Sequence, residues 1–280
     1  MDEVAGGYGL VEAPVWDPAR GLAFSDVLGG GVYRVGLDGA VSEVVPKRRG
    51  VGGMALHADG GLIVGGRNIA WVGDDGETRV LLEPAAIPGA IGFNDLTTDR
   101  AGRIYVGSLC YRVFADPPKP GFLHVIDLDS AMRTLSDGVM LTNGLGVSPD
   151  GSRLYHSDAR AGLVRVYDVR PDGSVGPWRQ FCTLGDGRVA DGLKVAAETE
   201  AGHHRPGHGE VHAVCAVRLE HGDPPAARVS HPHRPVGGED LRDLYVVTGS
   251  EGGPSERCGT IYKTRAPVAG LPLSPARVAI

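Results

Sequence analysis

Four side chains that carry oxygen donors occupy the same place in a phrase that recurs along the chain. The phrase begins with a polar residue, continues with a short apolar step and ends in Asp or Asp-Gly. Its copies start at Glu12, Gly53, Asn94, Asn143 and Asp191. Carboxylate and amide oxygens are the ligands that Ca²⁺, Mg²⁺ and Mn²⁺ prefer, and Zn²⁺ also accepts carboxylates. If the copies meet in space, these residue types predict a site for a divalent cation.

The same residues have a simpler interpretation. Asn-Gly and Asp-Gly are common tight-turn dipeptides, so Asn143 or Asp191 alone would be interpreted as a turn residue. Glu12 precedes Ala-Pro and has no turn role. Two buried carboxylates near each other also repel unless a cation or a proton compensates them. The four side chains taken together therefore favour the metal site.

The spacing of the phrase indicates the fold that would gather these residues. Successive copies start 41, 41, 49 and 48 residues apart, and short β-rich segments such as 21–26 and 153–158 follow them. A repeat of roughly 40 to 50 residues with about four strands is typical of a β-propeller. We therefore predict an all-β single domain over residues 1–280, a six-bladed propeller with four-stranded antiparallel blades. The innermost strand of each blade faces the central channel, where the first residues of the phrase would converge.

Residues 196–236 depart from the repeat. They contain no aromatic residue and no Ile, and they hold seven of the ten histidines. Such a stretch buries little apolar surface, so the fifth blade is expected to be irregular. A disordered or divergent insertion and a compensated reading-frame shift are both open explanations. His204, His208 and His212 are spaced four apart, but Pro206 interrupts the helix that would align them on zinc.

Composition argues against several classes of protein. The formal net charge is −6 and the basic residues are scattered, so no nucleic-acid partner is expected. No apolar run approaches the roughly 20 residues of a membrane span, and no signal peptide is evident. The four cysteines form no C-x-x-C pair and are expected to be reduced thiols. We expect a cytoplasmic protein, either a monomer or a small homo-oligomer, with no membrane partner.

The phrases resemble the motifs of one known family. Glu12-Ala-Pro-Val-Trp, Phe93-Asn-Asp95, Thr142-Asn-Gly-Leu and Asp191-Gly-Leu-Lys are similar to those of the gluconolactonase, regucalcin (senescence marker protein, SMP-30) and luciferin-regenerating enzyme family. The resemblance covers about residues 8–195 and resumes over 237–270. Such proteins are six-bladed propellers that hold one divalent cation through a Glu, an Asn and an Asp. The resemblance thus implies Glu12, Asn143 and Asp191 as ligands, with Ca²⁺ the leading candidate and Zn²⁺, Mn²⁺ or Mg²⁺ as alternatives.

The resemblance also implies an activity. Similar proteins hydrolyse sugar lactones or other small esters, so a metal-dependent lactonase, a carboxylic ester hydrolase of the gluconolactonase type, is expected to act here on a small-molecule lactone. A bound cation polarises a carbonyl group and lowers the pKa of water. Asp191 is implied as the general base as well as a ligand, and Asn94 as a contact to the substrate.

One departure from the family pattern leaves the substrate open. Similar proteins that act on sugar lactones often have Arg two residues before the Asn of the third phrase, where this chain has Gly92. Arg112, or else Lys119 in the same loop, is the predicted substitute, because residues 111–120 lie where similar proteins place a substrate lid. A propeller that acts on a non-sugar substrate in specialised metabolism is one alternative, and a non-catalytic cation-binding propeller is another.

Overall fold

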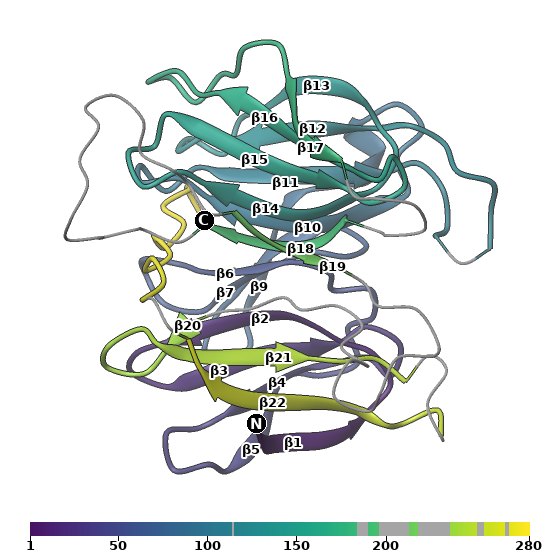
Figure 1. Ribbon diagram of the computed structural model, residues 1–280. Helices are drawn as coiled ribbons and strands as arrows, with labels where there is room; N and C mark the ends of the chain where they lie inside the picture. The colour runs from purple at the N-terminus through teal and green to yellow at the C-terminus, as the bar shows by residue number, and fades with distance from the viewer. Residues whose placement is uncertain (114, 184–189, 196–212, 218–235, 251–254, 267–268) are drawn as a thin grey trace.

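The computed structural model describes residues 1–113, 115–183, 190–195, 213–217, 236–250, 255–266 and 269–280. Over these ranges the protein is an all-β propeller whose antiparallel sheets follow one another around the molecule (Figure 1). One helical element is present there, the single 3₁₀ turn η1 (Pro84–Ala86). No helix in the described ranges is long and apolar enough to cross a membrane.

Five sheets have four antiparallel strands each. In the first four, each strand pairs with the next one in the sequence, as expected for short β-rich segments joined by tight turns. The first two are β2 (Val11–Asp17), β3 (Gly21–Asp26), β4 (Val32–Val35), β5 (Val41–Val45), then β6 (Met54–Leu56), β7 (Leu62–Val64), β8 (Ile69–Val72), β9 (Thr78–Leu82). The next two are β10 (Gly92–Thr98), β11 (Ile104–Leu109), β12 (Gly121–Ile126), β13 (Met132–Val139), then β14 (Thr142–Val147), β15 (Arg153–Asp158), β16 (Leu163–Asp168), β17 (Arg179–Thr183).

The last four-stranded sheet closes the ring with strands from both ends of the chain. It contains β20 (Val236–Gly237), β21 (Asp243–Val247) and β22 (Gly259–Arg265), and the N-terminal strand β1 (Asp2–Tyr8) pairs with β22 as its outermost strand. Tyr8 packs edge-on against Phe24 of β3, with ring centroids 5.0 Å apart. The first and last blades are therefore joined by backbone pairing and by a shared apolar cluster.

The structure confirms four strands for five of the six expected blades. For the fifth blade, as far as the structure describes it, the expectation of four strands is wrong. The fifth repeat holds the two-stranded sheet of β18 (Ala190–Val195) and β19 (Ala213–Val217). Residues 196–212 and 218–235, most of the atypical stretch, lie outside the described residues. The correction agrees with the composition there, because a segment without aromatic residues offers little apolar surface to pack.

The C-terminal segment spans the ends of the second and third blades. Ala276 accepts a hydrogen bond from Ala58 N and donates one to Leu56 O, both 2.8 Å long, where β6 ends. Arg277 N donates to Gly102 O, in the turn between β10 and β11. Val278 is almost completely buried in the cluster between these blades. The segment therefore fastens two blades together at the end of the propeller where their first strands finish.

This fastening yields a stability prediction. Val278→Asp is expected to lower the free energy of unfolding by roughly 3 kcal/mol or more, because the substitution buries a carboxylate without a partner. Leu273→Asp is a matched control in the same segment, since Leu273 is 40% exposed, and should change stability little. Urea unfolding followed by tryptophan fluorescence measures both. Equal effects of the two substitutions would contradict the packing of the segment.

Candidate functional site

Four of the sequence-predicted residues lie at irregularities of the first strands. The pairing register of β2 with β3 shifts between Glu12 and Val15. Equivalent shifts contain Asn94 in β10, Asn143 in β14 and Asp191 in β18. A β-bulge leaves a residue out of the ladder and re-aims its side chain. These first strands contact one another around the propeller, so the four residues occupy equivalent positions at one end of it.

Glu12 is buried, at 8% exposure, although it carries a carboxylate. The next residue, Ala13, has φ of 50°, a left-handed conformation that disfavours residues with a Cβ. The Ser25 hydroxyl in β3 lies 2.6 Å from the carbonyl oxygen of Val51 and 3.2 Å from that of Glu12. The backbone around Glu12 is thus held in a strained conformation by the adjacent strand and the next blade.

Asn94 bridges two neighbouring blades. Its side-chain amide donates a 2.7 Å hydrogen bond to the carbonyl oxygen of Thr142, the residue before Asn143. On its other side lies Gly52, where an added Cβ would be 2.2 Å from Asn94 Oδ1. Any other residue at position 52 would displace this amide. Asn94 is therefore fixed beside Asn143.

Asn143 is 9% exposed and lies against the strand that carries Asp191. The next residue, Gly144, approaches β18 so closely that an added Cβ would lie 2.0 Å from Leu193 N. Asp191 comes two residues before Leu193 in β18, and its side chain lies outside what the structure describes. The structure thus brings Asn94 and Asn143 together and sets the Asn143 and Asp191 strands side by side.

The donor chemistry of the described residues fits a hard cation better than a soft one. Among described side chains no group of three or more His, Cys, Asp or Glu residues could hold a metal ion. A buried carboxylate at Glu12 and a buried amide at Asn143, both on first strands, are oxygen donors. Mixed carboxylate and amide sets suit Ca²⁺ or Mg²⁺, whereas the described part of the site supplies no thiolate or imidazole ligand.

Arg112, the predicted substrate contact, is bound within its own loop. Its guanidinium group and backbone N–H bind Asp116, with the Nη2–Oδ1 distance 2.7 Å, and the side chain is largely exposed. The Arg112 guanidinium, together with the Arg112 backbone N–H, lowers the pKa of Asp116 to about 2. In this arrangement Arg112 does not contact Asn94 or Asn143 in any described interaction. The role of Arg112 stays a prediction.

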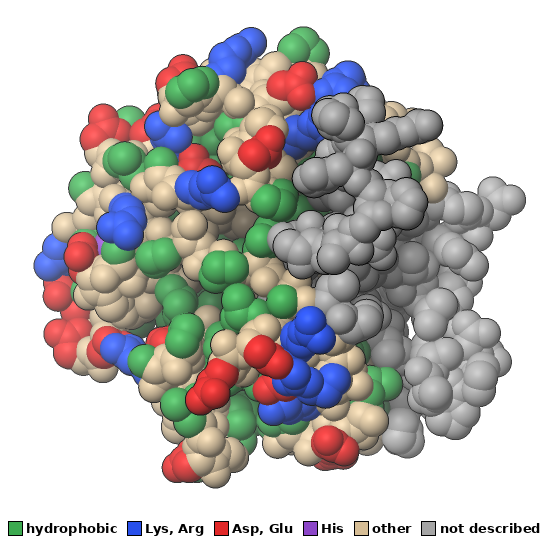
Figure 2. All heavy atoms as spheres, turned by 60° about the vertical axis from the view of Figure 1, so that its left-hand side comes forward, with side chains coloured by type: hydrophobic (Ala, Val, Ile, Leu, Met, Phe, Trp, Pro, Cys, Tyr) green, Lys and Arg blue, Asp and Glu red, His purple; other side chains and the backbone are tan. Residues whose placement is uncertain are grey.

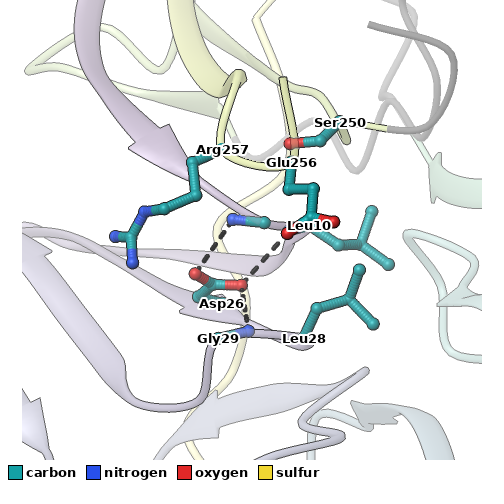
Figure 3. Close-up of a pocket in the computed structure, with 8 residues that line it drawn as sticks. Leu10, Asp26, Leu28, Gly29, Ser250, Glu256 and Arg257 are labelled. Atoms are coloured by element: carbon teal, nitrogen blue, oxygen red, sulfur yellow. Dashed lines mark hydrogen bonds between the residues drawn. The ribbon is translucent and has the colours of Figure 1, made fainter.

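A cavity of about 550 Å³ opens between the first and last blades. Leu10, Leu28 and Asp26 line it from the first blade, and Ser250, Glu256 and Arg257 from the last (Figure 3). Leu10 comes just before β2, so the cavity lies at the end of the blade that carries Glu12. Sequence reasoning missed this cavity, because its two walls are more than 200 residues apart in the chain.

Sequence reasoning also missed the polar residues behind Asn143. His156 Nε2 lies 3.0 Å from the hydroxyl of Thr142, and Asp158 accepts hydrogen bonds from the backbone N–H groups of Met140 and Leu141. A signal was available: β3 and β15 both end in Ser-Asp, at Asp26 and Asp158. A recurring acidic residue at the buried end of a strand points to a structural or functional contact rather than to a solvated turn.

The surface visible in Figure 2 has no continuous patch of one charge. Lys and Arg side chains are interspersed there with Asp, Glu and apolar residues. Such a mixed surface lacks the basic stripe that a polyanion-binding face presents. The candidate site is the end of the propeller where Glu12, Asn94 and Asn143 occupy equivalent bulges.

The fold and this end of the propeller define a class: β-propellers whose innermost strands carry carboxylate and amide residues at equivalent bulges. The chain belongs to the SMP-30/gluconolactonase/LRE-like family, whose model matches residues 10–250. It is 30% identical over 282 residues to a 6-deoxy-6-sulfogluconolactonase of Pseudomonas putida, covering 93% of this chain and 92% of that protein. It is 27% identical over 285 residues to the pentonolactonase XacC of Haloferax volcanii, covering 94% and 93%.

Solved structures agree on the fold. A luciferin-regenerating enzyme superposes with a TM-score of 0.79 at 18% identity, covering 99% of both chains. A calcium-binding protein, regucalcin, from Agrobacterium tumefaciens superposes with a TM-score of 0.77 at 17% identity, covering 99% of this chain and 97% of that one. At these identities the likeness establishes the propeller architecture. The family resemblance inferred from the sequence motifs is thus confirmed.

Two buried histidines stiffen the third and fourth blades in their neutral form. His124 lies 3.0 Å from Ser108 Oγ and 3.1 Å from Thr134 Oγ1, and burial lowers its pKa to about 4. Burial, with a smaller contribution from Arg165, lowers the pKa of His156 to about 3. Protonation of either ring would place a charge in the interior, so acid should weaken both blades.

We predict the resulting pH dependence for His124. An unfolded histidine has a pKa near 6.5, so below that pH the unfolded chain binds the proton more readily than the folded protein does. The contribution of neutral His124 to stability is complete above about pH 6.5 and is lost progressively as the pH falls toward 4. In His124→Gln, the pH slope of the unfolding free energy in this window should fall by up to about 1.4 kcal/mol per pH unit. Urea unfolding at several pH values measures the slope, and an unchanged slope would contradict the assignment.

Proposed function

We propose that the protein is a lactonase, a divalent-cation-dependent hydrolase that opens a sugar lactone or a similar small lactone. The observation that carries the proposal is the set of buried oxygen donors at one end of the first strands, in a chain that matches lactonases over more than nine-tenths of its length. Fold alone does not imply function, so the proposal depends on these residues together with the relatives.

The proposed cation ligands are Glu12, Asn143 and Asp191. Glu12 and Asn143 are buried at equivalent bulges, and the Asp191 backbone occupies the corresponding bulge of β18. We take β18 and β19 as the inner pair of the fifth of six blades, which would complete the ring around the site. Calcium is the leading candidate, because all three donors are oxygens and because regucalcin of A. tumefaciens is a calcium-binding protein of the same fold.

When bound, the cation would polarise the lactone carbonyl and lower the pKa of a water molecule at the site. The oxygen of the attacking water bonds to the carbonyl carbon, and Asp191 accepts a proton from this water. The ring C–O bond then breaks, and the proton passes to the departing ring oxygen to give the hydroxy acid. Asn94 uses one amide hydrogen on Thr142 O, and its second amide hydrogen contacts a substrate oxygen.

The substrate class follows from the groups near the site. Gly92 supplies no side chain to a substrate, and an added Cβ there would make a tight 3.0 Å contact with Gly66 O. Arg112 would have to leave Asp116 to reach a substrate hydroxyl. The described lining of the cavity between the first and last blades includes Leu10, Leu28, Glu256 and Arg257 but none of the proposed ligands, so the cavity does not define the substrate. The absence of an arginine at position 92 keeps a non-sugar lactone as a second candidate substrate.

The proposal predicts the behaviour of Asp191 variants. Asp191→Ala and Asp191→Asn should reduce kcat for lactone opening by about 10²–10⁴-fold, because the general base is lost. Asp150→Asn is a control: Asp150 lies at the far end of the fourth phrase and bonds only Ser148 and Ser152 in the described contacts. The assay compares aldonolactones with simple γ- and δ-lactones after chelation and after return of Ca²⁺, Mn²⁺, Mg²⁺ or Zn²⁺.

Two outcomes would contradict the proposal. Turnover that persists after chelation, with Asp191→Ala as active as the wild type, would remove the metal-assisted mechanism. A folded protein that binds a cation but opens no lactone of either kind would instead favour the non-catalytic cation-binding alternative.

A further inference from the structure

Two aspartates occupy the same position in the first and fourth blades and accept the same pair of backbone hydrogen bonds, although in the described contacts only Asp158 also forms a buried ion pair, with Arg165 Nη2 at 2.6 Å. Asp26 ends β3, and its carboxylate accepts hydrogen bonds from Gly9 N at 3.0 Å and Leu10 N at 3.2 Å (Figure 3). Asp158 ends β15 and accepts hydrogen bonds from Met140 N at 3.1 Å and Leu141 N at 3.0 Å. Both aspartates are at most 2% exposed. Each carboxylate thus binds two consecutive peptide N–H groups with its two oxygens.

The bound peptides come immediately before the strands that carry the proposed ligands. Leu10 lies two residues before Glu12, and Leu141 lies two residues before Asn143. The residue after each aspartate completes the attachment: Val27 N donates to Leu10 O at 2.8 Å, and Ala159 N donates to Leu141 O at 2.9 Å. The peptide before each ligand is therefore held at its N–H and at its carbonyl group.

The position is acidic only in these two of the described blades. Aligning the second strands at the residue after the Asp-Gly turn places Gly66, Ser108 and Thr248 at the equivalent position of the second, third and last blades. The pairing of β18 with β19 places Val217 there in the fifth. The second blade, with Gly66, begins its phrase with Gly53, which has no donor side chain. The aspartates thus accompany Glu12 and Asn143 rather than the propeller repeat as a whole.

Backbone strain gives an independent reason for such an attachment. Ala13 follows Glu12 with φ of 50°, and a residue in this conformation persists only when its surroundings hold it there. Val11 N donates to Thr248 O of the last blade at 3.1 Å, which fixes the other side of Glu12. Asp26 binds the residues just before this segment, at Gly9 N and Leu10 N. Its third hydrogen bond, from Gly29 N at 2.8 Å, connects it to the loop after β3.

We propose that Asp26 and Asp158 are positioning residues for the cation site: each holds the peptide two residues before a ligand and so fixes the direction of the Glu12 carboxylate or the Asn143 amide. This inference rests on the proposed function, because it takes Glu12 and Asn143 as ligands. Hydrogen bonds that orient ligands from behind commonly contribute about 10- to 100-fold to metal affinity. Both carboxylates are engaged by backbone N–H groups and would not themselves be ligands.

The test compares three matched Asp→Asn substitutions. An asparagine keeps one acceptor oxygen but turns an NH₂ group toward the second peptide N–H, so one of the two hydrogen bonds is lost. Asp158→Asn also removes the ion pair with Arg165, as Asp99→Asn removes the one with Arg103, so Asp99 controls for that loss. Asp99→Asn is the control. Asp99 is also buried, and it accepts hydrogen bonds from Gly102 N, Arg103 N and the Arg103 guanidinium. It lies just after the last residue of β10, whereas Asn94 lies near the start of that strand. Ca²⁺ and Mn²⁺ affinities are measured by titration calorimetry, and stability by urea unfolding.

Asp26→Asn and Asp158→Asn are expected to weaken cation affinity about 10- to 100-fold, whereas Asp99→Asn lowers stability and leaves affinity unchanged. Affinities equal to that of the wild type in the first two variants would overturn the inference and leave the proposed function intact. A loss of affinity that follows stability in all three variants would also overturn it. A wild-type protein that binds no divalent cation would overturn the proposed function itself, and with it this role.

If a variant does not fold, the positioning role can be tested on the wild-type protein. Coupling between two sites is reciprocal, so a cation held by ligands that the aspartates position must in turn stabilise the peptides that the aspartates bind. Hydrogen exchange at the Leu10 and Leu141 amides should slow on adding Ca²⁺ by a larger factor than at Gly102 and Arg103, which Asp99 binds. Equal slowing at all four amides would contradict the positioning role.

Discussion

The close approach of the innermost strands is the constraint on which the rest of the structure depends. An added Cβ at Gly53 would lie 2.4 Å from Leu96 N, and one at Gly144 would lie 2.0 Å from Leu193 N. Glycine is required where one backbone passes this close to another. Because these strands lie so close together, the buried polar groups at their starts must bind each other, the backbone or a ligand.

This packing connects the candidate site to the interior of the blades. Thr142 is contacted from two directions, by the Asn94 amide at its carbonyl group and by His156 at its hydroxyl. Both contacts lie next to Asn143. These two hydrogen bonds restrict the backbone before Asn143, although the other ring nitrogen of His156, Nδ1, is buried without a hydrogen-bond partner among the described residues. The same buried histidine that stiffens the site also makes the fourth blade sensitive to acid.

The sequence was sufficient for the parts of the fold that repeat locally. A period of 41 to 49 residues, with strands bounded by turns, predicted the propeller and the register that aligns Glu12, Asn94 and Asn143. The closing strand β1 was not predictable in this way, because its pairing with β22 joins the two ends of the chain and follows no period. The number of four-stranded blades was overestimated where the apolar pattern is lost, after Val195.

The same distinction applies to the site. The repeat placed Glu12, Asn94, Asn143 and Asp191 at equivalent positions of the first strands, which the register shifts show, and their roles stay predictions. Asp26 and Asp158 were missed, because their function depends on a contact with the loop before the preceding strand, and the pattern of apolar residues does not encode that contact. The cavity between the first and last blades was missed for the same reason as β1, since only ring closure creates it. Long-range closure is therefore the part of this protein that periodicity cannot predict.

The central claim is that one divalent cation is held between the first strands by Glu12, Asn143 and Asp191. Anomalous diffraction from crystals soaked in Mn²⁺ tests it most directly, because the scattering locates the metal independently of turnover. The account predicts one strong peak at the end of the channel, within coordination distance of oxygens from these three residues. No peak there, or a peak held by the histidines of residues 196–236, would contradict the account.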